Sequence, residues 1–291
     1  MIKCPSCEST SNQVTITRTG RGANEIRTDL NYTYRRRKCL RCGFMFSTRE
    51  ISEEEYKKMT SLKNPYGDGK ASQRIAKILE KSSIDAILVG DSLGNVALGY
   101  KNTIPVTLDD MIHHTKAVRK GAPHTLVITD MPFMSYRISS KKTLQYATRI
   151  FQETGTNAVK IEVNSDQDIE TIRILTECGM PVMAHVGLTP QFVEQFGGFH
   201  VQGKNDDHAE NILKQAKQTQ EAGAFSVVLE CIPHTLAKRI TEQLCIPTIG
   251  IGAGQNCDGQ VLVTQDLLGL TPGKIPNFVE PIANLKEDIK V

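Results

Sequence analysis

Five apolar runs of the chain each end in, or are directly followed by, an ionisable side chain. If these runs are parallel strands, their carboxyl ends meet at one edge of a sheet, where side chains from several strands can act on one small molecule. A single acidic residue at such a point could cap the next helix, but five in succession favour a shared site. The five are Asp91, Asp130, Glu162, His185 and Glu230, and Lys160 precedes Glu162 by two positions, which places both on one face of their strand.

Carboxylates that face one opening predict a bound cation, because they repel one another unless positive charge lies between them. Oxygen ligands without a His/Cys cluster favour a hard ion, usually Mg²⁺. Such an ion can chelate the carboxylate and ketone oxygens of a 2-oxo acid and polarise the ketone. Loss of a proton beside that ketone gives an enolate, whose charge the ion and a lysine such as Lys160 can stabilise. His185 suits either the pocket wall or a hydrogen-bonded core position.

A second group of chemically active residues lies near the start of the chain. Cys4, Cys7, Cys39 and Cys42 form two Cys-x-x-Cys pairs separated by a long loop, the spacing of a tetrahedral structural Zn²⁺ site. A module of this size has too small a core to fold without such a site. The other four cysteines lack metal-like spacing and are expected to be buried small hydrophobic residues; they are Cys178, Cys231, Cys245 and Cys257.

The elements that must position the strand-end residues follow a regular rhythm, in which short apolar runs alternate with amphipathic helical segments. Continuous apolar strands followed by helices indicate a parallel sheet covered by helices, and seven or eight such units favour a (βα)8 barrel of the TIM type. A doubly wound open sheet is the alternative, but no Gly-x-Gly-x-x-Gly follows the first run. The runs are residues 86–89, 125–128, 158–161, 182–184, 226–229, 248–251 and 260–263.

Three parts are expected along the chain. Residues 1–50 predict a small β-rich zinc ribbon, residues 51–71 a charged connector with turn composition, and residues 72–291 the barrel. The ribbon carries ten Lys/Arg against four Asp/Glu, whereas the rest of the chain has a net charge of −3. A basic module on a slightly acidic one suggests two parts with different partners.

The barrel part contains short motifs in a fixed order. They include residues 90–94 (GDSLG), 113–115 (HHT), 130–134 (DMPFM), 159–162 (VKIE), 185–190 (HVGLTP), 229–233 (LECIP) and 249–254 (IGIGAG). Any one is weak, but the ordered set is specific. Residues from about 60 to 291 resemble the ketopantoate hydroxymethyltransferase family, with the match strongest from about 80 to 275.

The resemblance implies a reaction and a set of roles. A hydroxymethyl group would pass from 5,10-methylenetetrahydrofolate to 3-methyl-2-oxobutanoate, giving 2-dehydropantoate in pantothenate (coenzyme A) biosynthesis. The residues Asp91, Asp130 and Glu162 would hold Mg²⁺, whereas Asp91, Ser92, Asp130 and Lys160 would contact the oxo acid, and Glu230 would be the catalytic base. The family also implies a homo-oligomer, a decamer by resemblance.

One family feature is not recognisable here. Members begin the barrel with a strand ending in Thr-Ala-Tyr-Asp, but this chain has residues 62–68, LKNPYGD, in that place. We therefore expect a degenerate or missing first strand and a substrate pocket less enclosed than the family's. An active transferase is the leading hypothesis, and a nucleic-acid-binding protein with a catalytically idle barrel is the alternative.

The basic ribbon has a resemblance of its own. The stretch from residue 35 to residue 50 is similar to the zinc ribbon of the bacterial ribonucleotide-reductase repressor NrdR, which implies nucleic-acid contact. A solvated basic face or a protein-binding ribbon are the other interpretations. The residues expected at the contact are Arg35, Arg36, Arg37, Lys38 and Arg41.

The composition and the lengths of the apolar runs predict the cellular compartment of the protein. Hydrophobic residues make up 39% of the chain and charged residues 23%, as in a globular protein. No apolar run has the length of a membrane span, and the first twenty residues lack the apolar core of a signal peptide. We therefore expect a cytoplasmic protein without membrane contact.

Overall fold

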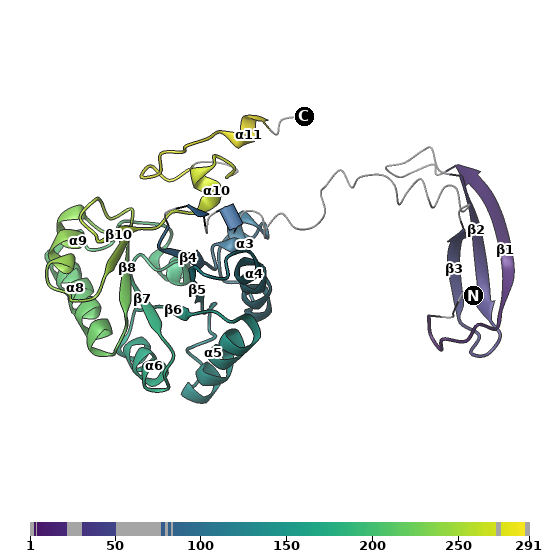
Figure 1. The fold of residues 1–291 in the computed structure, drawn as a ribbon, viewed down its shortest axis with the longest axis horizontal. Coiled ribbons are helices and arrows are strands. Elements are labelled where there is room, and N and C mark those ends of the chain that lie inside the picture. Colours follow the sequence, from purple (N-terminus) through teal and green to yellow (C-terminus); the bar gives the residue numbers. More distant parts are fainter. Residues whose placement is uncertain are drawn as a thin grey trace. The chain divides into compact units, whose positions relative to one another are not determined.

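The computed structural model describes residues 3, 5–21, 31–50, 77–78, 81–82, 84–271 and 275–288. The chain divides into two compact units, Met1–Gly69 and Lys70–Val291, which are described separately (Figure 1). The predicted connector, residues 51–71, and residues 60–70, where a first barrel strand would be sought, lie outside the described residues.

The first unit contains a three-stranded antiparallel sheet in the order β1-β2-β3. At one end of this sheet the Gly43 N–H donates to Cys39 O and closes a turn, and the Leu40 N–H donates to Ser11 O, which joins the end of β2 to the residue before β1. Gly43 has a φ of 75°, a left-handed conformation that glycine adopts without strain. The strands are β1 (Asn12–Arg21), β2 (Asn31–Cys39) and β3 (Met45–Glu50).

The second unit is built on a seven-stranded sheet in the order β10-β9-β8-β7-β6-β5-β4, with parallel neighbours throughout. Each strand therefore pairs with the strands next to it along the chain, as in half or more of a barrel. The strands are β4 (Ala86–Val89), β5 (Leu126–Asp130), β6 (Ala158–Glu162), β7 (Val182–Gly187), β8 (Ser226–Glu230), β9 (Thr248–Ile251) and β10 (Gly259–Gln260).

Helices follow the strands and cover the outer face of the sheet (Figure 1). Their ends have local causes: Thr107 and Asp110 form a capping box at the start of α4, and α5 ends at Gly155, whose φ is 70°. The helical elements are α3 (Leu93–Val96), α4 (Leu108–Gly121), α5 (Ser140–Thr154), α6 (Asp166–Glu177), η1 (Pro190–Phe192), α7 (Val193–Phe196), α8 (Asp206–Glu221), α9 (His234–Thr241), α10 (Thr264–Leu267) and α11 (Leu285–Asp288).

The predicted parallel α/β architecture is confirmed, as a half-barrel sheet with its helices. Within the residues described for this unit, β4 and β10 are the two edges of the sheet and do not pair with each other. The prediction of a less enclosed pocket depends on residues 60–70 and stays a prediction.

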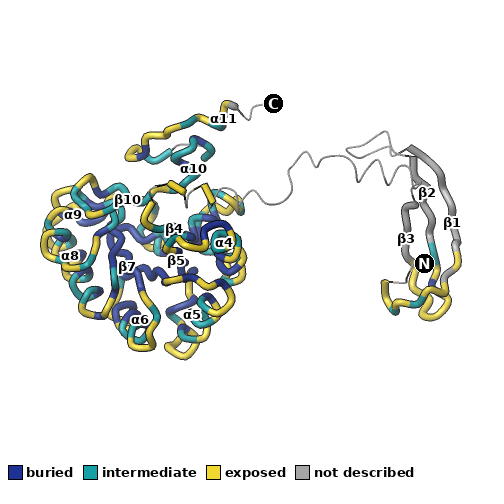
Figure 2. Tube along the Cα trace, viewed as in Figure 1, coloured by how far each residue is buried: buried dark blue, intermediate teal, exposed yellow. Residues whose placement is uncertain are grey.

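The central strands β6 and β7 are buried on both faces, and the two faces of the sheet pack against different partners. The outer face packs on the helices in one apolar core that includes Ile161, Val186 and Leu229 (Figure 2). The inner face starts with small and apolar side chains that pack together at the amino-terminal end of the strands, among them Ile128, Ala158, Met183 and Val228. Because side chains alternate along a strand, the next inward residues are two positions later.

Two of the scattered cysteines contradict the expectation that they are buried. Cys178 and Cys245 are exposed, since they lie where α6 and the segment after α9 reach solvent, and Cys231 and Cys257 are half-buried. None of the helices within the described ranges is both long enough and apolar enough to cross a membrane.

Candidate active site

The inward residues two positions beyond the apolar layer are the ionisable ones. Asp130 follows Ile128 at the end of β5, Lys160 follows Ala158 on β6, and His185 and Glu230 follow Met183 and Val228. The alternation predicted from the sequence for Lys160 and Glu162 thus applies to four neighbouring strands, and it gathers these side chains above an apolar floor.

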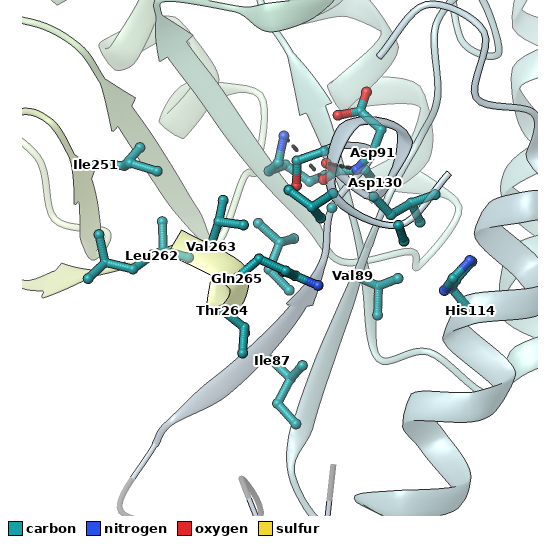
Figure 3. A pocket seen from close by; sticks show the side chains of 18 of the residues that line it. Ile87, Val89, Asp91, His114, Asp130, Ile251, Leu262, Val263, Thr264 and Gln265 are labelled. Carbon is teal, nitrogen blue, oxygen red and sulfur yellow. Dashed lines mark hydrogen bonds and ion pairs between the residues drawn. The ribbon is translucent and has the colours of Figure 1, made fainter. Parts of the chain in front are cut away.

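All six residues predicted for the magnesium, substrate and catalytic roles line one cavity of about 420 Å³, together with His185. Figure 3 shows Asp91 and Asp130 near each other at its wall, and the apolar side chains of Ile87, Val89 and Leu262 along other parts of it. The structure therefore brings the predicted set together. The six are Asp91, Ser92, Asp130, Lys160, Glu162 and Glu230.

A row of close contacts crosses the cavity from β5 to β8. Lys160 Nζ lies 3.1 Å from Asp130 Oδ1 and 3.2 Å from His185 Nδ1. The other ring nitrogen, His185 Nε2, lies 3.1 Å from Glu230 Oε2. Lys160 and His185 are buried, whereas the Glu230 side chain keeps 17% of its surface exposed. Glu230 is therefore the most exposed member of the row toward the cavity.

Each of the three predicted metal ligands has one oxygen held by a protein N–H. The Asp91 N–H donates to Asp130 Oδ2 at 2.9 Å, the Gln191 side chain donates to Asp91 Oδ2 at 2.8 Å, and the Gln191 N–H donates to Glu162 Oε2 at 3.0 Å. Asp130 Oδ1 is buried, and its neighbour is the Lys160 ammonium, 3.1 Å away. The carboxylates are therefore oriented, and a metal ion at Asp130 Oδ1 would share that oxygen with Lys160.

Burial and the closeness of the charged side chains shift the pKa values of the residues in this cavity. Burial, followed by the neighbouring Asp130 carboxylate, raises the pKa of Asp91 to about 7, and burial raises the pKa of Glu162 well above its usual range. Burial alone would lower the pKa of Lys160, but the Asp130, Glu162 and Asp91 carboxylates outweigh it and raise that pKa. Burial and the Lys160 ammonium lower the pKa of His185, which favours its neutral form. One cation among three carboxylates leaves excess negative charge, which suits a divalent ion.

The spacing of the carboxylates limits how Mg²⁺ could bind. An octahedral ion holds its oxygen ligands at about 2.1 Å, so any two ligand oxygens are at most about 4.2 Å apart. Among the described residues, the only three ligand atoms within 4.8 Å of one another belong to cysteines. The oxygens of Asp91, Asp130 and Glu162 are thus too far apart for direct ligation by all three. The donor set fits Mg²⁺ if at least one carboxylate acts through a water, as is common for this ion.

Ser92 and Gln191 show what the pattern of strand ends misses. Ser92 directly follows Asp91 within the motif 90–94, three residues after β4 ends, and it lines the cavity from the N-cap position of α3 without a cap hydrogen bond. Gln191 directly follows the motif 185–190 in sequence, yet its side chain reaches Asp91, one hundred positions earlier. Only its place beside a motif residue, Pro190, could have pointed to it.

The cysteine pairs of the first unit also meet. Cys7, Cys39 and Cys42 have their sulfur atoms within 4.8 Å of one another, and Cys7 Sγ lies 3.6 Å from Cys39 Sγ. Hydrogen bonds from the backbone of Cys42 and then of Arg41 favour the thiolate and lower the pKa of Cys39 to about 6. The predicted fourth ligand, Cys4, lies outside the described residues.

Comparison with known proteins identifies the second unit. A family model described as ketopantoate hydroxymethyltransferase matches residues 70–291. The chain belongs to the ketopantoate hydroxymethyltransferase family. The predicted membership is thereby confirmed for the barrel part, and the chain is a transferase of hydroxymethyl groups, as predicted.

Curated relatives agree with this hydroxymethyltransferase assignment. The chain is 56% identical to the 3-methyl-2-oxobutanoate hydroxymethyltransferase of Geobacillus thermodenitrificans (strain NG80-2) over 74% of this chain and 76% of the relative. It is 54% identical to the protein of that name from Bacillus cereus (strain G9842), over 74% and 77%. A dihydrodipicolinate synthase from Bacillus anthracis superposes with a TM-score of 0.48 at 12% identity over 71% of this transferase and 68% of that chain, too distant a likeness to carry an argument.

Proposed function

We propose that this chain transfers a hydroxymethyl group from 5,10-methylenetetrahydrofolate to 3-methyl-2-oxobutanoate, giving 2-dehydropantoate for pantothenate and coenzyme A biosynthesis. The observation that supports this most is the row of contacts from Asp130 through Lys160 and His185 to Glu230, inside a cavity of about 420 Å³. The reaction needs a positive charge that binds the oxo acid, which the Lys160 ammonium supplies. It also needs a carboxylate that removes the C3 proton, which Glu230 supplies.

The residues near Asp91 in the cavity would bind the oxo acid. Asp91, Asp130 and Glu162 would hold Mg²⁺, at least one of them through water, and the ion would polarise the ketone when bound. Lys160 places its ammonium beside Asp130, where it can also donate to an oxygen of the oxo acid. Ser92 lines the same part of the cavity and contributes a hydroxyl donor.

Glu230 acts as the base. Its carboxylate takes the proton from C3 of 3-methyl-2-oxobutanoate, and the electron pair of the broken C–H bond then forms the bond from C3 to the one-carbon unit. Over the whole reaction both C–N bonds between that unit and the folate break, and a water supplies the hydroxyl group. The C3 proton and the second proton of the water end on the two folate nitrogens, so that tetrahydrofolate leaves. His185 lies 3.1 Å from Glu230 Oε2 and keeps that carboxylate turned into the cavity. The His185 ring is buried between Lys160 and Glu230, and its role is to orient the base.

The test is an assay of the full chain with 3-methyl-2-oxobutanoate, 5,10-methylenetetrahydrofolate and Mg²⁺, scored by formation of 2-dehydropantoate. We expect Glu230→Gln to lower kcat by about 10²–10⁴-fold, the usual contribution of a positioned base. Exchange of the C3 proton of the oxo acid in D₂O should fall in parallel, and the exposed Glu242→Gln should behave as the parent chain. Turnover no higher than in Glu230→Gln would favour a catalytically idle barrel.

For the first unit we propose a structural Zn²⁺ held by Cys7, Cys39, Cys42 and Cys4. The three described thiols support this, because sulfur atoms gathered so closely match the donor set that Zn²⁺ prefers. A metal ion held by Cys7, Cys39 and Cys42 would tie the segment before β1 to the end of β2.

The remaining expectations stay proposals. Nucleic-acid contact through the ribbon draws support from Lys38 and Arg41, which are exposed, and Arg37, which is half-buried. The side chains of Arg35 and Arg36 lie outside what the structure describes. A homo-oligomer, a decamer by family resemblance, is proposed on the resemblance alone. A cytoplasmic location is proposed from the apolar pattern of the sequence.

A further inference from the structure

We propose that Gln191 is a positioning residue that holds two of the metal-binding carboxylates in place for the cation. The inference rests on the proposed function, since it takes Asp91 and Glu162 as ligands. Gln191 itself does not line the cavity, and it is 3% exposed. It therefore acts on the site from behind the wall rather than on the substrate.

Both the side chain and the backbone of Gln191 donate hydrogen bonds at this site. The side-chain Nε2 donates to Asp91 Oδ2 at 2.8 Å and to Met131 O at 3.0 Å. The backbone N–H donates to Glu162 Oε2 at 3.0 Å. One residue from η1, after β7, thus ties together the ends of β4, β5 and β6, which carry the three predicted ligands.

The orientation of the Gln191 amide is determined by its neighbours. Its Oε1 accepts from Tyr136 Oη at 2.9 Å and from Arg137 Nη1 at 3.3 Å. A guanidinium can only donate, so the oxygen has to face Arg137 and the NH₂ group has to face Asp91. Asp91 Oδ2 is consequently occupied by a neutral donor, which leaves the other Asp91 oxygen for a cation.

Arg137 is itself held rigidly, which makes it a dependable partner. Its guanidinium lies 4.2 Å from the centre of the Tyr136 ring and 4.3 Å from that of the Phe192 ring. It also pairs with the buried Asp168 at 2.8 Å and donates to Glu162 O at 2.9 Å. The same arginine therefore contacts both Gln191 and the strand that carries Glu162, which fixes the position of Gln191 relative to Glu162.

Manganese binding by the full chain tests the proposal without relying on turnover, because Mn²⁺ replaces Mg²⁺ at oxygen sites and is visible by electron paramagnetic resonance. We expect Gln191→Met, which keeps the chain length and the backbone N–H but removes the amide, to weaken Mn²⁺ binding by about 10–100-fold. Activity should fall at low Mn²⁺ and recover in part at high Mn²⁺, which a loss of folding alone would not produce. Gln202→Met is the matched control, since Gln202 is buried and donates to His200 O, away from the carboxylates.

Two more variants make the outcomes distinct. Asp91→Asn should abolish tight Mn²⁺ binding; if it binds as the parent chain does, the proposed metal site is wrong and the inference falls with it. If Asp91→Asn loses Mn²⁺ while Gln191→Met binds normally, the metal site stands and the role of Gln191 is refuted. If Gln191→Met fails to fold, Mn²⁺ binding by Tyr136→Phe tests the proposal instead. This substitution removes the Oη that donates to Gln191 Oε1 at 2.9 Å and to Glu162 O at 3.3 Å, while Arg137 still donates to both oxygens. This variant should weaken Mn²⁺ binding in the same direction, so unchanged affinity there overturns the proposal.

Discussion

His185 Nε2 lies 3.1 Å from Glu230 Oε2, while His185 Nδ1 lies 3.2 Å from Lys160 Nζ. The ring therefore spans the space between the proposed base on β8 and the lysine on β6, two strands away in the sheet order β8-β7-β6. Because His185 is 2% exposed, it can neither turn into solvent nor leave these partners without a rearrangement of the inner layer.

Replacing His185 by Phe should lower kcat for 2-dehydropantoate formation by about 10-fold or more, the lower range for loss of an orienting partner. The ring volume is kept, but Glu230 loses the contact that turns it into the cavity. Steady-state kinetics would show kcat falling more than the KM for the oxo acid changes. His113→Phe, on the exposed face of α4, is the matched control. A parent-like kcat in His185→Phe would mean that the base is oriented by something else.

Gly187→Ala should damage both stability and activity. Gly187 has a φ of 96°, and a Cβ there would overlap Glu230 O and lie 2.8 Å from Ile232 Cγ2. The backbone of the proposed base would have to move, in addition to the strain of about 1–2 kcal/mol for a left-handed residue. We expect a fall of more than 2 kcal/mol in the free energy of unfolding, together with a lower kcat.

Gly179→Ala is the control that distinguishes backbone strain at a positive φ from displacement of the Glu230 backbone. Gly179 has a φ of 81°, but a Cβ there meets nothing within 4 Å. It should cost about 1 kcal/mol by denaturant unfolding and leave kcat unchanged. Equal losses in the two variants would show that backbone strain, and not the approach to Glu230, explains Gly187→Ala.

Changing Cys42 to Ser should reduce the zinc content of the purified chain, measured by elemental mass spectrometry, from about one equivalent to a small fraction. A structural site needs four thiolates, and loss of one weakens the site and the fold it supports. The first unit should then become sensitive to protease, while turnover by the second unit is retained. Cys245→Ser, an exposed cysteine of the second unit, should keep its zinc. Full zinc content in Cys42→Ser would refute the site.

Thr107→Ala should destabilise the second unit by about 1 kcal/mol, because it removes the N-cap of α4. Hydrogen bonds from the Thr107 side chain and then its backbone lower the pKa of Asp110. The folded carboxylate is thus more acidic than in the unfolded chain, so its contribution is present above its usual pKa and is lost as pH falls through the lowered one. The difference between parent and variant, followed by denaturant melts, should shrink in acid. Thr107→Ser keeps the hydroxyl and should melt like the parent; a gap that is the same at every pH would contradict the capping explanation.

The sequence alone determined the parts of this site that depend on local periodicity. Alternation along a strand places Lys160 and Glu162 on one face, and an apolar run followed by an acid marks the carboxyl end of a buried strand, as at Asp91, Asp130 and Glu230. The motifs also identified the family of residues 70–291. The spacing of Cys7, Cys39 and Cys42 predicted that their thiols would meet. By contrast, burial of Cys178 and Cys245 was predicted wrongly, because neighbours along the chain do not reveal which face of a helix end meets solvent.

Only the tertiary structure decided which side chain supports which. Gln191 and Asp91 are one hundred positions apart, and their contact exists because the turn after β7 folds back over the ends of β4, β5 and β6. That path depends on Arg137 packing between the Tyr136 and Phe192 rings, which are far apart in the sequence. The spacing of the three carboxylates, too wide for direct ligation by all of them, likewise follows from packing. Periodicity sets the face on which a residue lies, but distances between side chains on different strands depend on how the loops and rotamers pack together.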